Sequence, residues 1–140
     1  MKPSHHAVIS SVAGVILAVL VNSYQAGIAC FISGILTDID HHLEYYLAKG
    51  RVPFRYSELV DFCVNERKQK LYLFLHSYEF IIALWLCVYF FSLGGVIFGI
   101  AVGMSIHLLC DQFVNPQRFL FYFIIFRIMH GFNSDVFYKE

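Results

Sequence analysis

The stretch Gly95–Asp111, which reads GVIFGIAVGMSIHLLCD, decides how this chain of 140 residues folds. It is largely apolar and carries one histidine and one carboxylate, His107 and Asp111, at its end. Glycine recurs at every fourth residue, and a step of four residues turns only about 40° around a helix, so Gly99, Gly103, His107 and Asp111 share one face. Small residues at this spacing let transmembrane helices approach closely. We therefore expect a membrane helix whose small face points into a bundle.

Two earlier apolar runs carry faces of the same kind. Each face consists of small side chains and includes one ionisable residue at one end: His6, Ser10, Gly14 and Ala18 in the first run, and Gly27, Cys30, Gly34 and Asp38 in the second. We expect the three faces to meet inside one bundle.

The composition indicates an integral membrane protein. Apolar residues make up 59% of the chain and charged residues 14%, whereas soluble domains average about 25% charged residues. The mean hydropathy is +0.64. The net charge is zero and no run of Lys and Arg forms a basic patch, so we expect membrane lipids as partners and no nucleic acid.

The apolar runs predict an all-α fold of one domain, residues 1–140: an integral membrane bundle of four transmembrane helices in two hairpins, plus a C-terminal interfacial helix. The expected spans cover about residues 6–22, 24–38, 71–91 and 93–111, although the first two apolar runs are short for a bilayer core that needs about 20 residues. Residues 42–70 form a polar loop, with a possible surface helix at 56–70. Residues 119–130 are too short to span and contain Arg127, so an interfacial or re-entrant helix is expected there, with a fifth span as the alternative.

The basic residues predict the orientation of the four spans in the inner membrane. They all fall on one side, and both hairpin turns lack them: Lys2, Lys49, Arg51, Arg55, Arg67, Lys68, Lys70, Arg118, Arg127 and Lys139. By the positive-inside rule, both termini and the central loop are expected to be cytoplasmic. No small-x-small cleavage pattern follows Lys2, so we expect the first apolar run to be retained as a span.

Four ionisable side chains are expected at one depth of this bundle. His6, Asp38, His76 and His107 each lie about 14 to 16 residues from a distal turn, which corresponds to roughly 21 to 24 Å along a helix. Taken singly, each has a simpler interpretation, as an interfacial histidine, a helix end at the membrane surface or a hydrogen-bonded pair. Their common depth and shared faces favour a functional site, because ionisable groups at membrane depth are costly.

Imidazole and carboxylate are the usual nitrogen and oxygen ligands of zinc and related ions. His107 and Asp111 are separated by four residues and His76 and Glu79 by three, and both spacings let two helical ligands reach one ion. The expected metal ligands are His6, Asp38, Asp40, His41, His76, His107 and Asp111, with Glu79 as general base or further ligand. This set exceeds what one tetrahedral ion needs, so we expect one or two divalent ions, zinc first, with a bridging carboxylate. Such a site suits hydrolysis.

These motifs, in this order, resemble the YdjM-like family of membrane-bound metal-dependent hydrolases, which is distantly similar to zinc-dependent phospholipase C. The resemblance rests on His6, Gly34–His41 (Gly-x-x-x-Asp-x-Asp-His), His76 with Ser77, and Gly103–Asp111 (Gly-x-x-x-His-x-x-x-Asp), and it spans about residues 5–116. It implies a hydrolase. The chain departs from the family at Thr37, where the family has proline, and it lacks the histidine that the family places before His76-Ser77.

We therefore expect a metal-dependent hydrolase acting at the cytoplasmic leaflet, on a lipid or other phosphoester. Two other classes remain open. One is an ion transporter or proton-coupled channel that uses the same buried groups as a relay. The other is a non-catalytic membrane subunit that docks a partner through the basic central loop.

Overall fold

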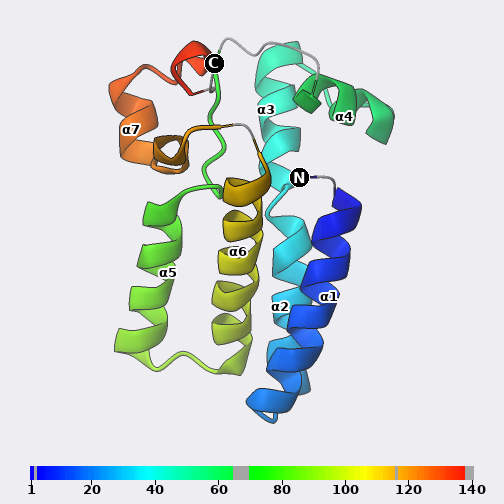
Figure 1. Cartoon of the computed structure of the whole chain (residues 1–140), viewed down its shortest axis with the longest axis vertical. Helices are drawn as coiled ribbons and strands as arrows, with labels where there is room; N and C mark the ends of the chain where they lie inside the picture. Colours follow the sequence, from blue (N-terminus) through cyan, green and yellow to red (C-terminus); the bar gives the residue numbers. More distant parts are fainter. Residues whose placement is uncertain (2, 65–69, 116, 138–140) are drawn as a thin grey trace.

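The computed structural model describes residues 1, 3–64, 70–115 and 117–137, and within them every regular element is a helix. Four helices lie side by side: α1 (Pro3–Leu20), α2 (Tyr24–Leu36), α5 (Tyr78–Phe91) and α6 (Gly95–Val114) (Figure 1). Shorter elements cover one end of this bundle: α3 (Ile39–Lys49), α4 (Tyr56–Val64), η1 (Phe119–Tyr122), α7 (Ile124–Met129) and η2 (Ser134–Val136). The all-α class is thereby confirmed.

Helices α1, α2 and α6 pack closely because glycines face backbone atoms of the neighbouring helix. A Cβ atom added at Gly14 would lie 2.7 Å from the carbonyl oxygen of Gly27, and one added at Gly103 would collide with the carbonyl oxygen of Cys30. The buried residues of α1 include His6, Ser10 and Gly14, which belong to the predicted small face. The expected faces of α2 and α6 are buried in the same interface.

Two helices are long and apolar enough to cross a membrane: α1, with 18 residues, and α6, with 20 residues, each at a mean hydropathy of 1.6. Helices α2 and α5 have only 13 and 14 residues. The bundle nevertheless exposes large apolar side chains on all four helices. They include Val8, Val12, Val15 and Val19 on α1, Ile28, Ile32 and Leu36 on α2, Ile82, Leu86 and Phe90 on α5, and Val96, Leu109 and Phe113 on α6.

Helix α5 begins at Tyr78, whereas the sequence predicted a span from residue 71. The hydroxyl of Ser77 caps the helix by accepting a hydrogen bond from the backbone N–H of Phe80 at 3.3 Å. Residues 71–77 form a non-helical segment, called the strap below, in which Leu71 and Leu73 are buried. The apolar run from residue 71 suggested a longer helix. In the structure its leucines instead fill the core at the covered end of the bundle.

The region predicted as a polar loop contains two helices, α3 and α4. Helix α3 ends at Lys49, and Gly50 caps it. Gly50 has a φ of +70°, a backbone conformation that residues with a side chain rarely adopt. Tyr45, Leu59 and Phe62 are buried where the two helices meet. The expected surface helix is observed from residue 56 to 64, and residues 65–69 lie outside the described part of the chain.

The predicted interfacial helix at 119–130 is divided into the 3-10 turn η1 and the six-residue helix α7. It covers the end of the bundle, and α7 is far too short to be the fifth span considered as an alternative. The aromatic residues Phe121 and Tyr122 pack with the strap, Leu108 and Phe137 in one apolar cluster. This cluster surrounds the segment that carries His76.

Candidate metal centre

Side chains from four parts of the chain meet at the covered end of the bundle. His6 comes from α1, Asp38 from the joint between α2 and α3, His76 from the strap, and His107 and Asp111 from α6. All except Asp38 are at most 3% exposed. His6, Asp38, His107 and Asp111 offer ligand atoms that all lie within 4.8 Å of one another. The structure therefore brings together residues that the sequence placed at one depth.

His76 approaches the same centre, and its distances to three of these residues are short. Nε2 of His76 lies 3.1 Å from Nε2 of His107. Oδ1 of Asp38 is 3.7 and 3.5 Å from these two nitrogens, and Oδ2 of Asp111 is 3.6 Å from each. Ligands at about 2.0 to 2.1 Å around a tetrahedral zinc ion lie about 3.3 to 3.4 Å apart, so these five distances are close to those between zinc ligands.

The other ring nitrogen of each histidine is held by an acceptor. Nδ1 of His107 donates to the carbonyl oxygen of Gly34 at 2.7 Å, and Nδ1 of His76 donates to Oδ2 of Asp40 at 3.3 Å. Each bond places the proton on Nδ1 and turns the lone pair of Nε2 inward, as in metal-bound histidines. Two such lone pairs only 3.1 Å apart repel each other unless a proton or a metal ion lies between them.

Asp40, expected as a metal ligand, instead accepts a hydrogen bond from Nδ1 of His76, the ring nitrogen that faces away from the centre. Its Oδ2 also accepts hydrogen bonds from the backbone N–H groups of Leu75 and His76. Asp40 is 5% exposed and belongs to neither group of possible metal ligands among the described residues. Asp38 lies just before α3 and Asp40 lies in its first turn, because α3 begins at Ile39. The carboxylate of Asp38 therefore faces the centre, whereas that of Asp40 faces the strap.

A second group of possible ligands consists of Asp38, His41 and His76. Nε2 of His41 lies 3.6 Å from Oδ1 of Asp38, and its Nδ1 lies 3.8 Å from Glu44. This group shares Asp38 and His76 with the first set of atoms, so His41 is the residue that it adds. The expected second ion stays a prediction.

His6 closes the centre on the side of α1. Its ring stacks on His107 at 3.8 Å between centroids, and its Nε2 lies 3.0 Å from Oδ1 of Asp111. The amino group of Met1 bonds the same oxygen at 2.8 Å. One oxygen of Asp111 thus faces His6, and the other faces His76 and His107.

The carboxylate of Asp38 is strongly stabilised in its charged form. Burial alone would raise the pKa of Asp38, but the adjacent imidazoles of His107 and His76, when they carry a proton on Nε2 as well, hold it well below its usual range. An ionised carboxylate at this position requires a nearby cation. A protonated imidazole or a bound metal ion meets this requirement.

The expected role of Glu79 as base or ligand is not supported by its position. Its two carboxylate oxygens accept hydrogen bonds from the backbone N–H groups of Ile124 and Ile125, at 2.9 and 3.1 Å, and so hold the start of α7. The prediction assumed one continuous helix through His76 and Glu79. Because α5 begins only at Tyr78, the two side chains do not share a helical face.

Sequence reasoning missed Arg127, which organises the strap. It is fully buried, and its guanidinium donates to the backbone carbonyl oxygens of Tyr72, Leu73 and His76, the last at 3.2 Å. Burial lowers the pKa of Arg127 to about 10, so it remains charged at neutral pH. The available signal was a single arginine within an apolar stretch, where an unpaired charge would be costly.

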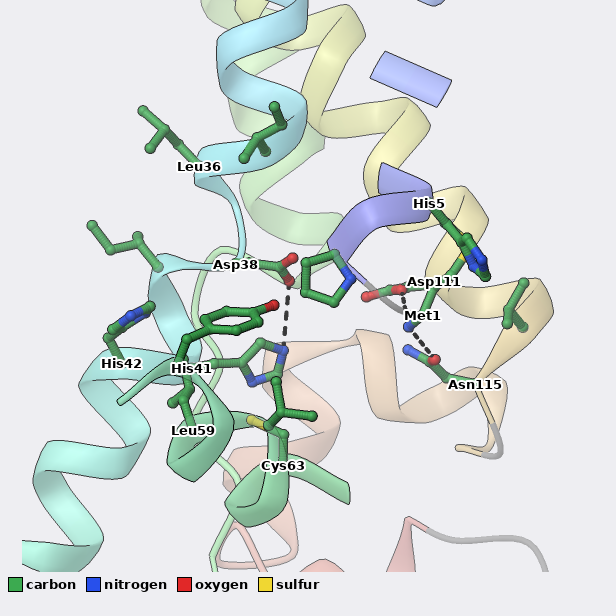
Figure 2. Close-up of a pocket in the computed structure, with 16 residues that line it drawn as sticks. Met1, His5, Leu36, Asp38, His41, His42, Leu59, Cys63, Asp111 and Asn115 are labelled. Atoms are coloured by element: carbon green, nitrogen blue, oxygen red, sulfur yellow. Dashed lines mark hydrogen bonds and ion pairs between the residues drawn. The ribbon is translucent and has the colours of Figure 1, made fainter. Parts of the chain in front are cut away.

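A pocket of about 820 Å³ opens directly onto the centre (Figure 2). Asp38, His41 and Asp111 line it, and α4 contributes Leu59 and Cys63. A molecule in this pocket can reach the side chains of the metal centre.

No family model matches the chain, and no significant match was found among curated proteins or solved structures.

Proposed function

We propose that this protein is a metal-dependent hydrolase of the inner membrane that cleaves phosphoesters at the cytoplasmic surface. The observation that carries the proposal is that carboxylate oxygens of Asp38 and Asp111 each lie 3.5 to 3.7 Å from Nε2 of His76 and of His107, which are 3.1 Å apart. The bonds from Nδ1 of both histidines direct their Nε2 lone pairs toward the same point. The motif resemblance to YdjM-like hydrolases supports the same reaction class.

The donor set fits zinc, because imidazole nitrogen and carboxylate oxygen are among its preferred ligands. His76, His107, Asp38 and Asp111 would hold one ion, and His41 together with the shared Asp38 would hold a second. A bound ion supplies water of lowered pKa and stabilises the charge on the phosphoryl oxygens.

The reaction assigned to the site is hydrolysis. A water oxygen forms a new bond to phosphorus, the bond from phosphorus to the leaving oxygen breaks, and the proton of the water passes to that oxygen. Asp38 and Asp111 each lie 3.5 to 3.7 Å from both imidazoles and would hold the ion beside the phosphate.

The proposed membrane placement puts all four long helices in the bilayer. It is supported by the length of α1 and α6 and by the apolar side chains exposed on all four helices. Because α2 and α5 are short, the bilayer would be thinned beside them. The segment that ends α3 and leads to α4 carries Lys49, Arg51 and Arg55, and by the positive-inside rule these basic residues favour a cytoplasmic position for the covered end.

An ion pathway receives less support from the interior of the bundle. Below the centre, α1 meets α2 at Gly14 and Gly27, and α6 meets α2 at Gly99 and Gly103, in each case with backbone contact. Such close packing leaves no room for a chain of ions or waters along that interface. Hydrolysis is therefore better supported than transport.

Metal analysis of the purified protein tests the proposal. The full chain in detergent, incubated with zinc and then dialysed, is expected to retain bound zinc, and His107→Ala and Asp111→Ala should lose most of it. Asp135→Asn, which changes an exposed carboxylate on η2, is the matched control and should retain the metal. The zinc-loaded protein should hydrolyse methyl p-nitrophenyl phosphate, and the two centre variants should not. A wild-type protein without metal, or a His107→Ala variant with full occupancy, would contradict the proposal.

A further inference from the structure

The pocket above the metal centre has an apolar interior, and α4 covers it. We call it the roofed pocket. Leu36 and Ile39 line one side, and Leu59 and Val60 of α4 line another. Among the described residues that line it there is no lysine or arginine. The carboxylates of Asp38 and Asp111 and the imidazoles of His5, His41 and His42 are among the ionisable groups that line the pocket, and Figure 2 labels these five residues.

A second cavity, of about 630 Å³, lies between α2, α5 and α6, and we call it the α2 groove. It is lined almost wholly by apolar side chains, including Ile28 and Ile32 of α2 and Ile100 of α6. Leu36 and Ile39 belong to the lining of both cavities. Leu36 and Ile39 therefore lie between the metal centre and the α2 groove, and Ile28 and Leu36 are about half exposed on the outer surface of α2.

This arrangement matches one kind of ligand. A small, highly charged phosphate compound would find few cationic partners in the roofed pocket beyond histidines, whereas sites for such compounds usually employ arginine or lysine. A hydrocarbon chain would bury apolar surface against Leu36, Ile39 and the α2 groove, and each buried CH₂ group strengthens binding roughly fourfold.

We propose that the substrate is a membrane phosphoester with a long hydrocarbon chain. Its phosphate lies at the metal centre in the roofed pocket, and its chain passes over Leu36 and Ile39 into the α2 groove. This inference rests on the proposed hydrolase function and adds the class of substrate and the route by which it binds.

Two esters with the same leaving group test the substrate class. The zinc-loaded full chain is assayed with methyl p-nitrophenyl phosphate and with hexadecyl p-nitrophenyl phosphate. The wild type should have a KM for the hexadecyl ester at least roughly tenfold lower than for the methyl ester, since many CH₂ groups are buried.

Variants that fill the path locate the chain. Leu36→Trp and Val60→Trp should raise the KM of the hexadecyl ester roughly tenfold, because an indole occupies space that the chain needs. They should leave bound zinc unchanged and should change the KM of the methyl ester much less than that of the hexadecyl ester. Leu47→Trp, on the exposed surface of α3 and outside both cavities, is the matched control and should change neither substrate. Equal KM values for the two esters in the wild type, or equal effects of the variants on both, would overturn the inference.

A binding measurement separates this inference from the hydrolase proposal. Hexadecyl phosphate with a diazirine at the end of its chain is photolysed with the full chain in nanodiscs, and labelled peptides are mapped. Labelling concentrated on residues 28–39, reduced by Leu36→Trp but not by an excess of inorganic phosphate, supports the route even if neither ester is hydrolysed. Labelling spread evenly over the exposed surfaces of α1, α5 and α6 would overturn the route, even if the protein proves to be a hydrolase.

Discussion

The metal centre has two halves that are held in different ways. In the helical half, α1, α2 and α6 position His6, His107 and Asp111 through close helix packing, with glycine against backbone. In the strap half, His76 lies on a non-helical segment whose position depends on polar anchors, chiefly Asp40 and Arg127. The helical half has few alternative arrangements, because its backbones are in contact. The strap half keeps its position only while its hydrogen bonds are made.

The two halves should therefore respond differently to mutation. Disturbing the helical half should unfold the protein, since a side chain cannot be added without separating the helices. Disturbing the strap half should release one ligand and leave the bundle in place. Four experiments test this division, in order of decreasing expected effect.

The largest effect is expected from Gly103→Leu in the helical half. The new side chain would collide with the carbonyl group of Cys30, and overpacking of this kind should lower the free energy of unfolding by at least about 3 kcal/mol. Thermal unfolding in detergent measures the change. Gly94→Ala is the matched control, because a Cβ there meets nothing within 4 Å and its φ of −62° suits alanine. Equal stability of the two variants would show that close packing does not hold the helical half.

Arg127→Met should have the next largest effect, centred on the strap. Three backbone carbonyl groups of the strap would lose their donor, which should cost about 2 kcal/mol of stability and weaken zinc binding through His76. Zinc titration and thermal unfolding of the same samples measure both quantities. Arg118→Met, which removes an exposed arginine nearby, should change neither. If Arg127→Met bound zinc as tightly as the wild type, the strap would not depend on this anchor.

Asp40→Asn should affect the metal more than the fold. The amide preserves the shape of the side chain but weakens the bond to Nδ1 of His76, and loss of such a support typically lowers metal affinity by roughly tenfold or more. Competition with a zinc chelator measures the affinity. Glu79→Gln provides the comparison, because Glu79 holds α7 and should leave the affinity unchanged. A loss of zinc in Glu79→Gln, with none in Asp40→Asn, would reverse the roles assigned to the two carboxylates.

The smallest effect is expected at the exposed anchor of α4. Arg51 and then Tyr45 lower the pKa of Glu58 from 4.5 to about 2, so the contacts of Glu58 stabilise the α3–α4 pair above pH 4.5 and are lost as the pH falls toward 2. Pepsin should therefore cleave the chain between residues 50 and 64 faster as the pH is lowered over this interval. The increase should exceed the change in the activity of pepsin itself, which is measured with an unfolded substrate. Glu58→Gln should abolish the additional pH dependence. An identical pH profile in the variant would show that α4 is held by its apolar contacts alone.

The sequence predicted the helical half well because helical periodicity carries the information. Spacing by four residues placed His107 and Asp111 on one face with Gly99 and Gly103, and the structure buries that face. The same reasoning failed for residues 71–77, where an apolar run suggested a longer helix. The hydroxyl of Ser77 and the burial of Leu71 and Leu73 favour an extended path there, and these depend on contacts with residues far away in the chain.

The roles of Arg127 and Asp40 were outside the reach of sequence spacing for the same reason. Arg127 bonds carbonyl groups about 50 residues earlier, and Asp40 bonds the strap 35 residues later. Such pairings follow from the tertiary fold and leave no periodic pattern. The motifs indicated which side chains gather at this end of the bundle, whereas the tertiary fold decides which of them face the centre and which, like Asp40, bond the strap instead.

The early end of α2 has a consequence for how this chain can vary. In a continuing helix the N–H of Asp38 would bond the carbonyl oxygen of Gly34, but here it bonds that of Ile35 at 3.3 Å, and the Gly34 oxygen is left to orient the imidazole of His107 at 2.7 Å. Lengthening α2 by even one turn would return that oxygen to the helical ladder, where the N–H of Asp38 would share it with the imidazole. In the proposed membrane placement, the length of α2 and the orientation of His107 therefore depend on the same peptide group.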